Sequence, residues 1–146
     1  MIKKIRTPVD KRVKVNMEGS EVEAVLQWRK DFGTRRTAGF QAAQVYVDSE
    51  VIRLSDPLTP MRTGTLKKSG LTATVTGSGT VTYNAPHARY QYYGKVMVGR
   101  APKRLTNKDL TYEGAPQRGA KWFERMKAQN RNEILKGAAK IAAGKK

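Results

Sequence analysis

The sequence contains no cysteine and only one histidine, His87, among its 146 residues. The lack of cysteine excludes disulfide bonds and thiolate metal sites. A single histidine without cysteine cannot form a zinc cluster of the usual type, and no partner is visible that would make it the base of a nucleophile–base pair. We therefore expect no catalytic residue, no metal site and no cofactor. His87 is expected to pack or to lie on the surface.

Long apolar runs are also missing, and the mean hydropathy is −0.64. No segment approaches the roughly 20 apolar residues of a membrane-spanning helix. The N-terminal residues 1–6 carry charge but precede no apolar region, so they do not resemble a secretory signal. The length predicts a single domain over residues 1–146, and we expect no membrane partner.

Acidic residues are scarce, with 12 against 29 basic residues, which gives a net charge of +17. A field of this sign attracts polyanions and acidic protein surfaces, and it opposes self-association unless the contacts overcome the repulsion. Composition alone leaves two partners open, nucleic acid and an acidic neighbouring protein.

Two patterns organise the first half of the chain. Residues 11–17 alternate apolar and polar side chains, which predicts a strand with one wet face. Residues 20–23 have the form of a capping box, Ser-x-x-Glu, and apolar residues at helical spacing follow as far as Leu54. Asp56-Pro57 would end that helix, because a residue before proline disfavours helical ψ. The prediction is a helical region of two segments, or one long helix with a defect at residues 33–34.

Threonine and valine dominate the next segment. Residues 71–76 and 80–83 alternate, and Gly77-Ser78-Gly79 separates them. Two alternating runs joined by a short glycine link predict a β-hairpin at about residues 71–84.

The last third combines an aromatic stretch, a long connection and a helix. Residues 85–93 predict a turn of helix or an irregular strand, and residues 95–98 a further strand. Residues 99–119 lack periodicity and predict an extended loop or arm, a feature that is often functional. Residues 120–142 predict a C-terminal helix that packs through Trp122, Phe123, Met126 and Ile134. Residues 1–10 are expected to form a tail, and residues 144–146 to fray.

Tyrosines lie among basic residues in and around the predicted arm. Interleaved aromatic and basic side chains can bind single-stranded nucleic acid. Tyrosine equally suits half-wet packing and subunit interfaces, and we favour this second interpretation. The candidate subunit or partner contacts are Arg89, Tyr90, Tyr93, Lys95, Arg100, Lys103, Arg104 and Tyr112.

One motif series resembles a known family. The segment DPLTPMRTGTLKKSG resembles the P-x-x-T-G-x-L-x-x-S segment of small minor capsid and head–tail connector proteins of tailed bacteriophages. Arg62 stands where that family commonly has an acidic residue. Later segments, V-x-Y-N, A-x-Y-x-x-x-G and G-x-x-W-F-E-R, resemble the family in the same order. The motif residues are Pro60, Thr63, Gly64, Leu66 and Ser69; proline pre-sets φ and glycine allows positive φ in the predicted turn.

The resemblance implies an α+β fold with a helical N-terminal half, a curved antiparallel sheet and a C-terminal helix. It implies no catalytic residues, and a homo-oligomeric ring, six-fold by expectation, at the neck of the virion. There the chain would contact neck, connector and tail proteins after assembly in the bacterial host cytoplasm. The alternative is a basic nucleic-acid-binding protein, and contact with genomic DNA fits either role. An enzyme would need a carboxylate-only site that is not visible.

Overall fold

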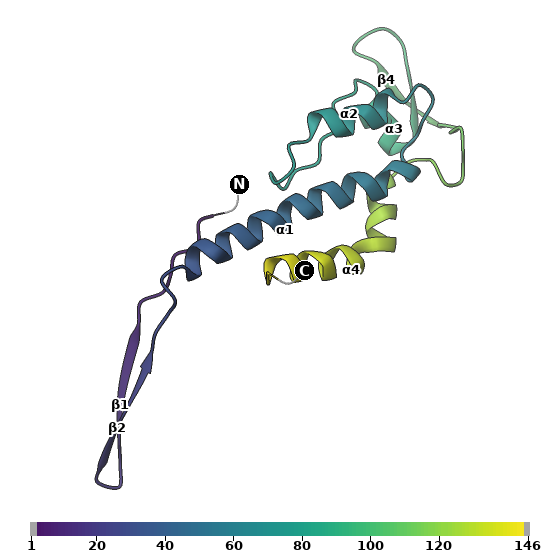
Figure 1. Ribbon diagram of the computed structural model, residues 1–146. Helices are drawn as coiled ribbons and strands as arrows, with labels where there is room; N and C mark the ends of the chain where they lie inside the picture. Colours follow the sequence, from purple (N-terminus) through teal and green to yellow (C-terminus); the bar gives the residue numbers. More distant parts are fainter. Residues whose placement is uncertain (1–2, 145–146) are drawn as a thin grey trace.

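Two long helices form the body of the molecule in the computed structural model, which describes residues 3–144. Helices α1 and α4 lie against each other, and smaller elements extend from both ends of the pair (Figure 1). The fold is α+β, as predicted. Its elements are β1 (Lys11–Met17), β2 (Ser20–Leu26), α1 (Phe32–Ser55), the 3-10 turn η1 (Asp56–Leu58), α2 (Thr65–Ala73), α3 (Ala88–Tyr93), β3 (Lys95–Val98), β4 (Arg104–Asp109) and α4 (Trp122–Ala142).

Glycine lets α1 and α4 approach closely. A Cβ added to Gly39 of α1 would lie 2.8 Å from the carbonyl oxygen of Ala142, and one added to Gly137 of α4 would collide with the ring of Tyr46. The apolar core lies nearer the other end of the pair, where the connections after α1 close over α4. Its buried members are Leu58, Leu66, Ala85, Ala88, Trp122, Met126 and Ile134, with Val47, Val51, Leu54, Tyr83 and Tyr92 packed around them.

The capping box at residues 20–23 does not begin a helix. Strand β1 forms as predicted, but Ser20–Leu26 is strand β2, which pairs with β1 in an antiparallel hairpin. Glu18 and Gly19 form the connection with φ of 45° and 85°, the pattern of a two-residue turn whose twist matches that of paired strands. Cross-strand pairing therefore overrides the local capping signal, and α1 begins only at Phe32.

The prediction of a hairpin at residues 71–84 is also wrong. Residues 65–73 form helix α2, and residues 74–84 form an irregular loop. The Thr74 hydroxyl links the two arms of that loop, because it accepts from the Thr82 N–H at 3.0 Å and donates to the Thr82 carbonyl oxygen at 3.4 Å. The buried carboxylate of Asp48 holds the glycine link by accepting from the backbone N–H groups of Gly77 and Gly79 at 2.8 and 3.0 Å. A carboxylate from α1 thus fixes the glycine link of a loop that has no strand ladder.

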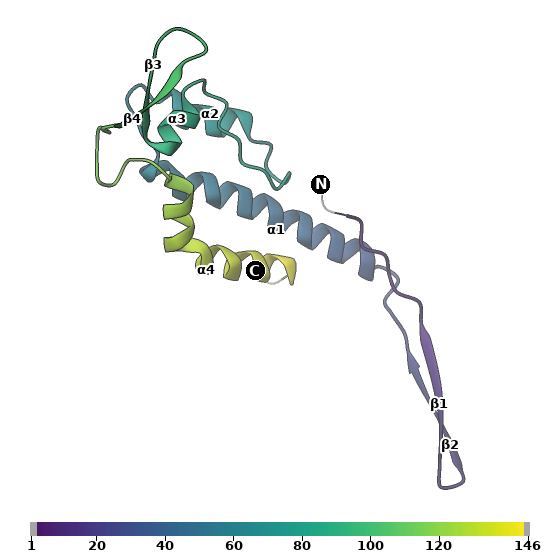
Figure 2. The ribbon, with the colours of Figure 1, turned by 180° about the vertical axis from the view of Figure 1, so that it is seen from behind.

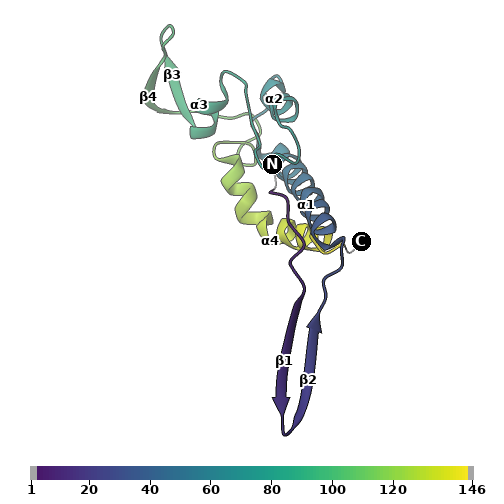
Figure 3. The ribbon, with the colours of Figure 1, turned by 90° about the vertical axis from the view of Figure 1, so that its left-hand side faces the viewer.

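Strand β3 confirms the strand predicted at residues 95–98, and it pairs with β4, which lies within the segment 99–119 that was predicted to be an arm, in a second hairpin. The observed sheets are two separate antiparallel pairs, not one curved sheet. Residues 99–103 connect β3 to β4, and residues 110–121 return the chain to α4. The two hairpins lie at opposite ends of the body (Figure 3). Residues 1–2 of the expected tail and 145–146 of the expected frayed end lie outside the described residues.

Candidate assembly interface

The β1–β2 hairpin projects away from the body as a separate finger. All seven residues of β1 and all seven of β2 are exposed, and two opposite views show the finger extending beyond the start of α1 (Figures 1 and 2). A lone two-stranded hairpin is at best marginally stable in water. A hairpin of this kind becomes more stable when another surface covers one of its faces. The finger is therefore a candidate for contact with another protein.

The strand register gives the finger two different faces. Residues directly opposite each other share a face, and the register pairs Val13 with Ala24 and Val15 with Val22. Five large side chains of this apolar face are between 47% and 63% exposed, namely Val13, Val15, Met17, Val22 and Leu26.

The opposite face of the finger is charged and internally paired. Arg12 lies 3.7 Å from Glu23, and Lys14 lies 2.7 Å from Glu21, in two diagonal ion pairs. These charges keep one face in water while the apolar face remains uncovered. Exposed apolar patches rimmed by polar groups typically mark interaction sites.

Hydrogen bonds join the two legs of the finger to each other and fix its base to α1. The Asp10 carboxylate accepts from the Trp28 N–H at 2.8 Å, and the Thr7 hydroxyl accepts from the Gly33 N–H at 3.0 Å. A Cβ on Gly33 would lie 2.6 Å from Thr7 N, so the chain before β1 crosses α1 at a position where only glycine fits. The finger therefore leaves the body from an anchored base.

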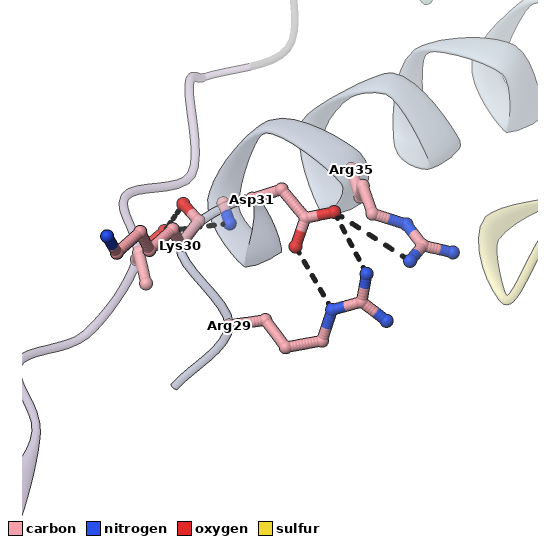
Figure 4. Close-up of polar contacts among 6 residues, drawn as sticks. Arg29, Lys30, Asp31 and Arg35 are labelled. Atoms are coloured by element: carbon pink, nitrogen blue, oxygen red, sulfur yellow. Dashed lines mark hydrogen bonds and ion pairs between the residues drawn. The ribbon is translucent and has the colours of Figure 1, made fainter. Parts of the chain in front are cut away.

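Charged side chains surround the same junction. Asp31, which immediately precedes α1, accepts from Arg29 at 3.2 Å and lies 3.8 Å from Arg35, as Figure 4 shows. The Arg36 guanidinium lies 5.6 Å from the centre of the Phe32 ring. Two arginines paired with this carboxylate and a third over the neighbouring ring leave a local excess of positive charge. Sequence reasoning missed this cluster because its residues belong to no motif.

A groove opens between α1, the loop after α2 and the start of α4. Its volume is about 520 Å³, and its apolar lining includes Val47, Val51, Val81 and Phe123. Asp48 also lies at its wall, but that carboxylate is only 3% exposed and already accepts the two loop N–H groups. We call this feature the α1/α4 groove. Its lining is mainly apolar, although the buried Ser55 hydroxyl at its wall has no hydrogen-bond partner among the described residues.

Two arginines hold the return segment at residues 110–121 on the end of α1. The Arg118 guanidinium donates to the carbonyl oxygens of Asp56 and Thr59 at 3.1 and 2.6 Å. Arg125 of α4 donates to the carbonyl oxygens of Pro116 and Gln117 at 3.0 and 2.6 Å. Much of the predicted arm is thus fixed to the body, by residues whose role no sequence motif indicated.

The predicted basic contact residues gather on the β3–β4 hairpin. Arg100, Lys103 and Arg104 are exposed at its turn and at the start of β4, whereas Lys95 forms an ion pair with Asp109 on the partner strand. Arg89 lies apart from them on α3, where it is exposed. The second hairpin therefore presents free positive charge at the end of the body opposite the finger.

The predicted tyrosines do not form one stacking surface. Tyr112 donates to the carbonyl oxygen of Gln91 at 2.6 Å, and burial raises the pKa of its hydroxyl. Tyr93 is 55% exposed, and its ring faces the Lys121 ammonium at 4.4 Å. Tyr90 is half-buried beside His87. These positions favour packing and surface contact over base stacking.

The family-like motif at residues 60–69 has a structural explanation. Gly64 has φ of 78°, as its turn requires, and precedes α2. Pro60, Leu66 and Ser69 are buried, and the Ser69 hydroxyl donates to the Leu66 carbonyl oxygen at 2.7 Å. Thr63 is exposed, with its hydroxyl 3.0 Å from that of Thr65. The motif attaches α2 to the core.

Helix α4 places its predicted packing residues in two environments. Trp122, Met126 and Ile134 are buried in the core, and Trp122 meets the Tyr83 ring edge-on at 5.4 Å between centroids. Burial raises the pKa of the Tyr83 hydroxyl. Phe123, which was predicted to pack with them, is instead 40% exposed and lines the α1/α4 groove.

The described residues show no arrangement typical of a catalytic or metal site. His87 is half-buried on the wall of an open cavity of about 440 Å³ that also contacts Gln91 and Tyr112. Within residues 3–144, no three acidic or histidine side chains are grouped to hold a metal. Over the same range no helix has the length and apolar character needed to cross a bilayer. Glu50 has a lowered pKa, but the cause is a hydrogen bond from Arg53 beside it on α1.

A family model described as minor capsid protein matches residues 12–142. The chain belongs to this minor capsid protein family. The match begins within β1 and ends at the last residue of α4, so the finger and both long helices lie inside it. Membership indicates a structural role in the phage virion. No curated protein and no solved structure matches the chain.

Proposed function

We propose that this minor capsid protein acts at the head–tail junction, where copies form a ring that joins the DNA-filled head to the tail. The observation that supports the proposal best is the β1–β2 finger, which lies within the family match and exposes an uncovered apolar face. A projecting contact element and an elongated body suit a protein whose work is to bridge neighbours. The role requires contacts and no catalytic group.

The junction also accounts for the distribution of charge. The β3–β4 hairpin carries Arg100, Lys103 and Arg104 in exposed positions, and such a hairpin can face either DNA or an acidic neighbouring subunit. In a ring around the DNA passage both contacts are available to the same protein. A six-fold ring remains the expectation for its symmetry.

The second candidate is a free nucleic-acid-binding protein. It is favoured by the net charge of +17 and by the exposed arginines around Asp31 and on the β3–β4 hairpin. For contacts with backbone phosphates, the logarithm of the affinity falls linearly with the logarithm of the salt concentration. Saturable, salt-dependent binding of duplex DNA by the isolated chain would favour this candidate.

Particle morphology tests the first proposal directly. A phage in which the gene is deleted should accumulate filled heads and separate tails, and supplying the wild-type chain from a plasmid should restore joined particles. If the deletion phage still joins filled heads to functional tails, the proposed role is wrong. If it makes no heads at all, the chain acts earlier, as part of the shell, and the proposal also fails.

A further inference from the structure

We infer that the apolar face of the β1–β2 finger docks into the α1/α4 groove of a second copy of this chain. The inference rests on the proposed function, because it supplies the contact between neighbours in the ring. Each copy would then give its finger to one neighbour and accept the finger of the other.

The neutrality of the finger makes a second copy of this basic chain accessible to it as a partner. Residues 11–26 hold three basic and three acidic residues and are neutral, whereas residues 27–146 hold 23 basic and 8 acidic residues, a net charge of +15. Two bodies of this charge repel each other at every approach. The finger, which projects from the body and carries no net charge, can enter the field of another body without that cost.

The tip of the finger adds a directional preference. Its turn carries Glu18, with Glu21 and Glu23 on the following strand. Glu21 and Glu23 are paired with Lys14 and Arg12 on the charged face. It is therefore Glu18 in the turn that would meet charge of the opposite sign as the tip enters a basic body. Electrostatic complementarity of this kind orients a contact more than it tightens it, and here it favours the body of another copy over an acidic protein.

The groove offers apolar surface to match. Val47, Val51 and Val81 line it, and Phe123 stands partly exposed at its side. The finger cannot reach the groove of its own chain, because it leaves the body at the start of α1 and points away from it (Figure 2). The contact must therefore form between molecules.

The two surfaces are different, which determines the assembly. A finger that docks into a groove is a head-to-tail interface, and repetition of such an interface generates closed rings or open filaments. Contact between the apolar faces of two fingers would instead be self-complementary and would stop at a dimer. The number of chains in the cross-linked product distinguishes these two cases.

The absence of cysteine from the chain makes cross-linking selective. Val15→Cys places a thiol in the centre of the apolar face, and Phe123→Cys places one at the groove. The double variant, oxidised within assembled particles and in concentrated full-length protein at high salt, should give a ladder of dimers, trimers and higher species on a non-reducing gel. Asn16→Cys with Phe123→Cys is the matched control, because Asn16 lies one residue away on the charged face.

Four results would overturn the inference. They are a dimer that forms with Val15→Cys alone, a link from Val15→Cys to a different virion protein, equal ladders from the control pair, and no link in assembled particles. None of these bears on whether the deletion phage joins heads to tails, so the proposed function can stand while the docking inference fails. If the deletion phage joins heads to tails but the cross-linked ladder forms, the proposed function is wrong and the docking inference stands.

A charge substitution gives an independent readout in particles. Val15→Glu buries a carboxylate in the proposed contact and should reduce the yield of joined particles at least tenfold. Asn16→Glu adds the same charge to the opposite face and should leave the yield within about twofold, a difference of only about 0.4 kcal/mol. Equal yields from the two variants would contradict docking through the apolar face.

Discussion

Asp48 shows at the scale of one residue how the loop after α2 is held. Its carboxylate is 3% exposed and accepts from Gly77 N–H, Gly79 N–H and the Gln44 side-chain amide. The carboxylate is buried while Gly77 is half-buried and Gly79 exposed, so the main cost of losing it is the loss of hydrogen bonds to a charged acceptor. The same carboxylate also forms part of the wall of the α1/α4 groove.

Asp48→Asn is therefore expected to destabilise the protein by about 1–3 kcal/mol. Both glycine N–H groups bond to Oδ2, so in asparagine a neutral amide oxygen would replace that charged acceptor, and the amide NH₂ would replace Oδ1 and face the side-chain amide of Gln44. Hydrogen bonds to a charged acceptor are the stronger kind, so both contacts to the loop should weaken. The measurement is the urea unfolding midpoint followed by circular dichroism. Glu133→Gln, which changes an exposed carboxylate on α4, is the control and should leave the midpoint unchanged. An unchanged midpoint for Asp48→Asn would show that the loop does not depend on this carboxylate.

Gly70 on α2 gives a second residue-scale prediction. A Cβ at this position would lie 2.6 Å from the ring of Tyr83. Helix propensity alone predicts that Gly70→Ala stabilises α2 by about 1 kcal/mol, but overpacking typically costs about 1–3 kcal/mol. We expect net destabilisation in thermal unfolding.

A double-mutant cycle separates the two effects of Gly70→Ala. In a Tyr83→Ala background the ring is absent, so the substitution should become neutral or stabilising there. If Gly70→Ala destabilises equally in both backgrounds, the contact with Tyr83 is not the cause.

At the scale of elements, the sequence predicted what short-range periodicity determines. Strand β1, helix α4 and the end of the α1 region at Asp56 follow from local patterns. Strand β2 was missed because Ser20–Leu26 satisfies two patterns at once, a capping box and an alternation that places Val22 and Leu26 on one side. The partner strand decides between them, and a partner is not a local property.

The loop at residues 74–84 was mistaken for strands for a related reason. Its threonines and glycines suit a hairpin, but the groups that fix it belong to Asp48, about 30 residues earlier in the sequence. The candidate interface shows the same limit. The basic residues of the β3–β4 hairpin were found by composition, whereas the α1/α4 groove and the exposed position of Phe123 arise only when α1, α4 and the loop come together.

The finger is an element that the body does not need for its own stability. Its strand residues are all exposed, and it contributes no member to the buried core. Replacing residues 12–25 by Asn-Gly would join Lys11 to Leu26, which are paired, through a tight two-residue turn. The anchoring bond between Asp10 and Trp28 would remain.

We expect this shortened chain to keep its helical circular dichroism and a melting temperature within about 3 °C of wild type, a change of less than about 1 kcal/mol. Calorimetry at matched salt measures it, with Asp10→Ala, which removes the anchor but keeps the finger, as a comparison. A large loss of stability on shortening would mean that the finger supports the body, and defects in its particles could then not be assigned to a lost contact.

For the whole molecule, the dominant property is a body of high positive charge with one neutral projection. Screening weakens repulsion between bodies, since the Debye length falls from about 10 Å at 0.1 M salt to about 3 Å at 1 M. The affinity of docking through the apolar face should fall little as salt rises, because burial of apolar surface does not depend on charge. Self-association and nucleic-acid binding should therefore respond to salt in opposite directions.

Sedimentation velocity between about 0.05 and 1 M NaCl tests this prediction. The wild-type chain should form larger species as salt rises, whereas its binding to duplex DNA should weaken linearly in log–log terms over the same range. Val15→Glu should abolish the salt-induced association and leave DNA binding nearly unchanged, because Val15 pairs with Val22 near the turn of the finger, several residues from the arginines at its base and far from those of the β3–β4 hairpin. A chain that stays monomeric at every salt concentration while it binds DNA saturably would favour the nucleic-acid-binding role. If association at high salt requires Val15, the ring is favoured. Such a result would show that screening the charge allows one specific contact to form, and that the larger species are not due to a general loss of solubility.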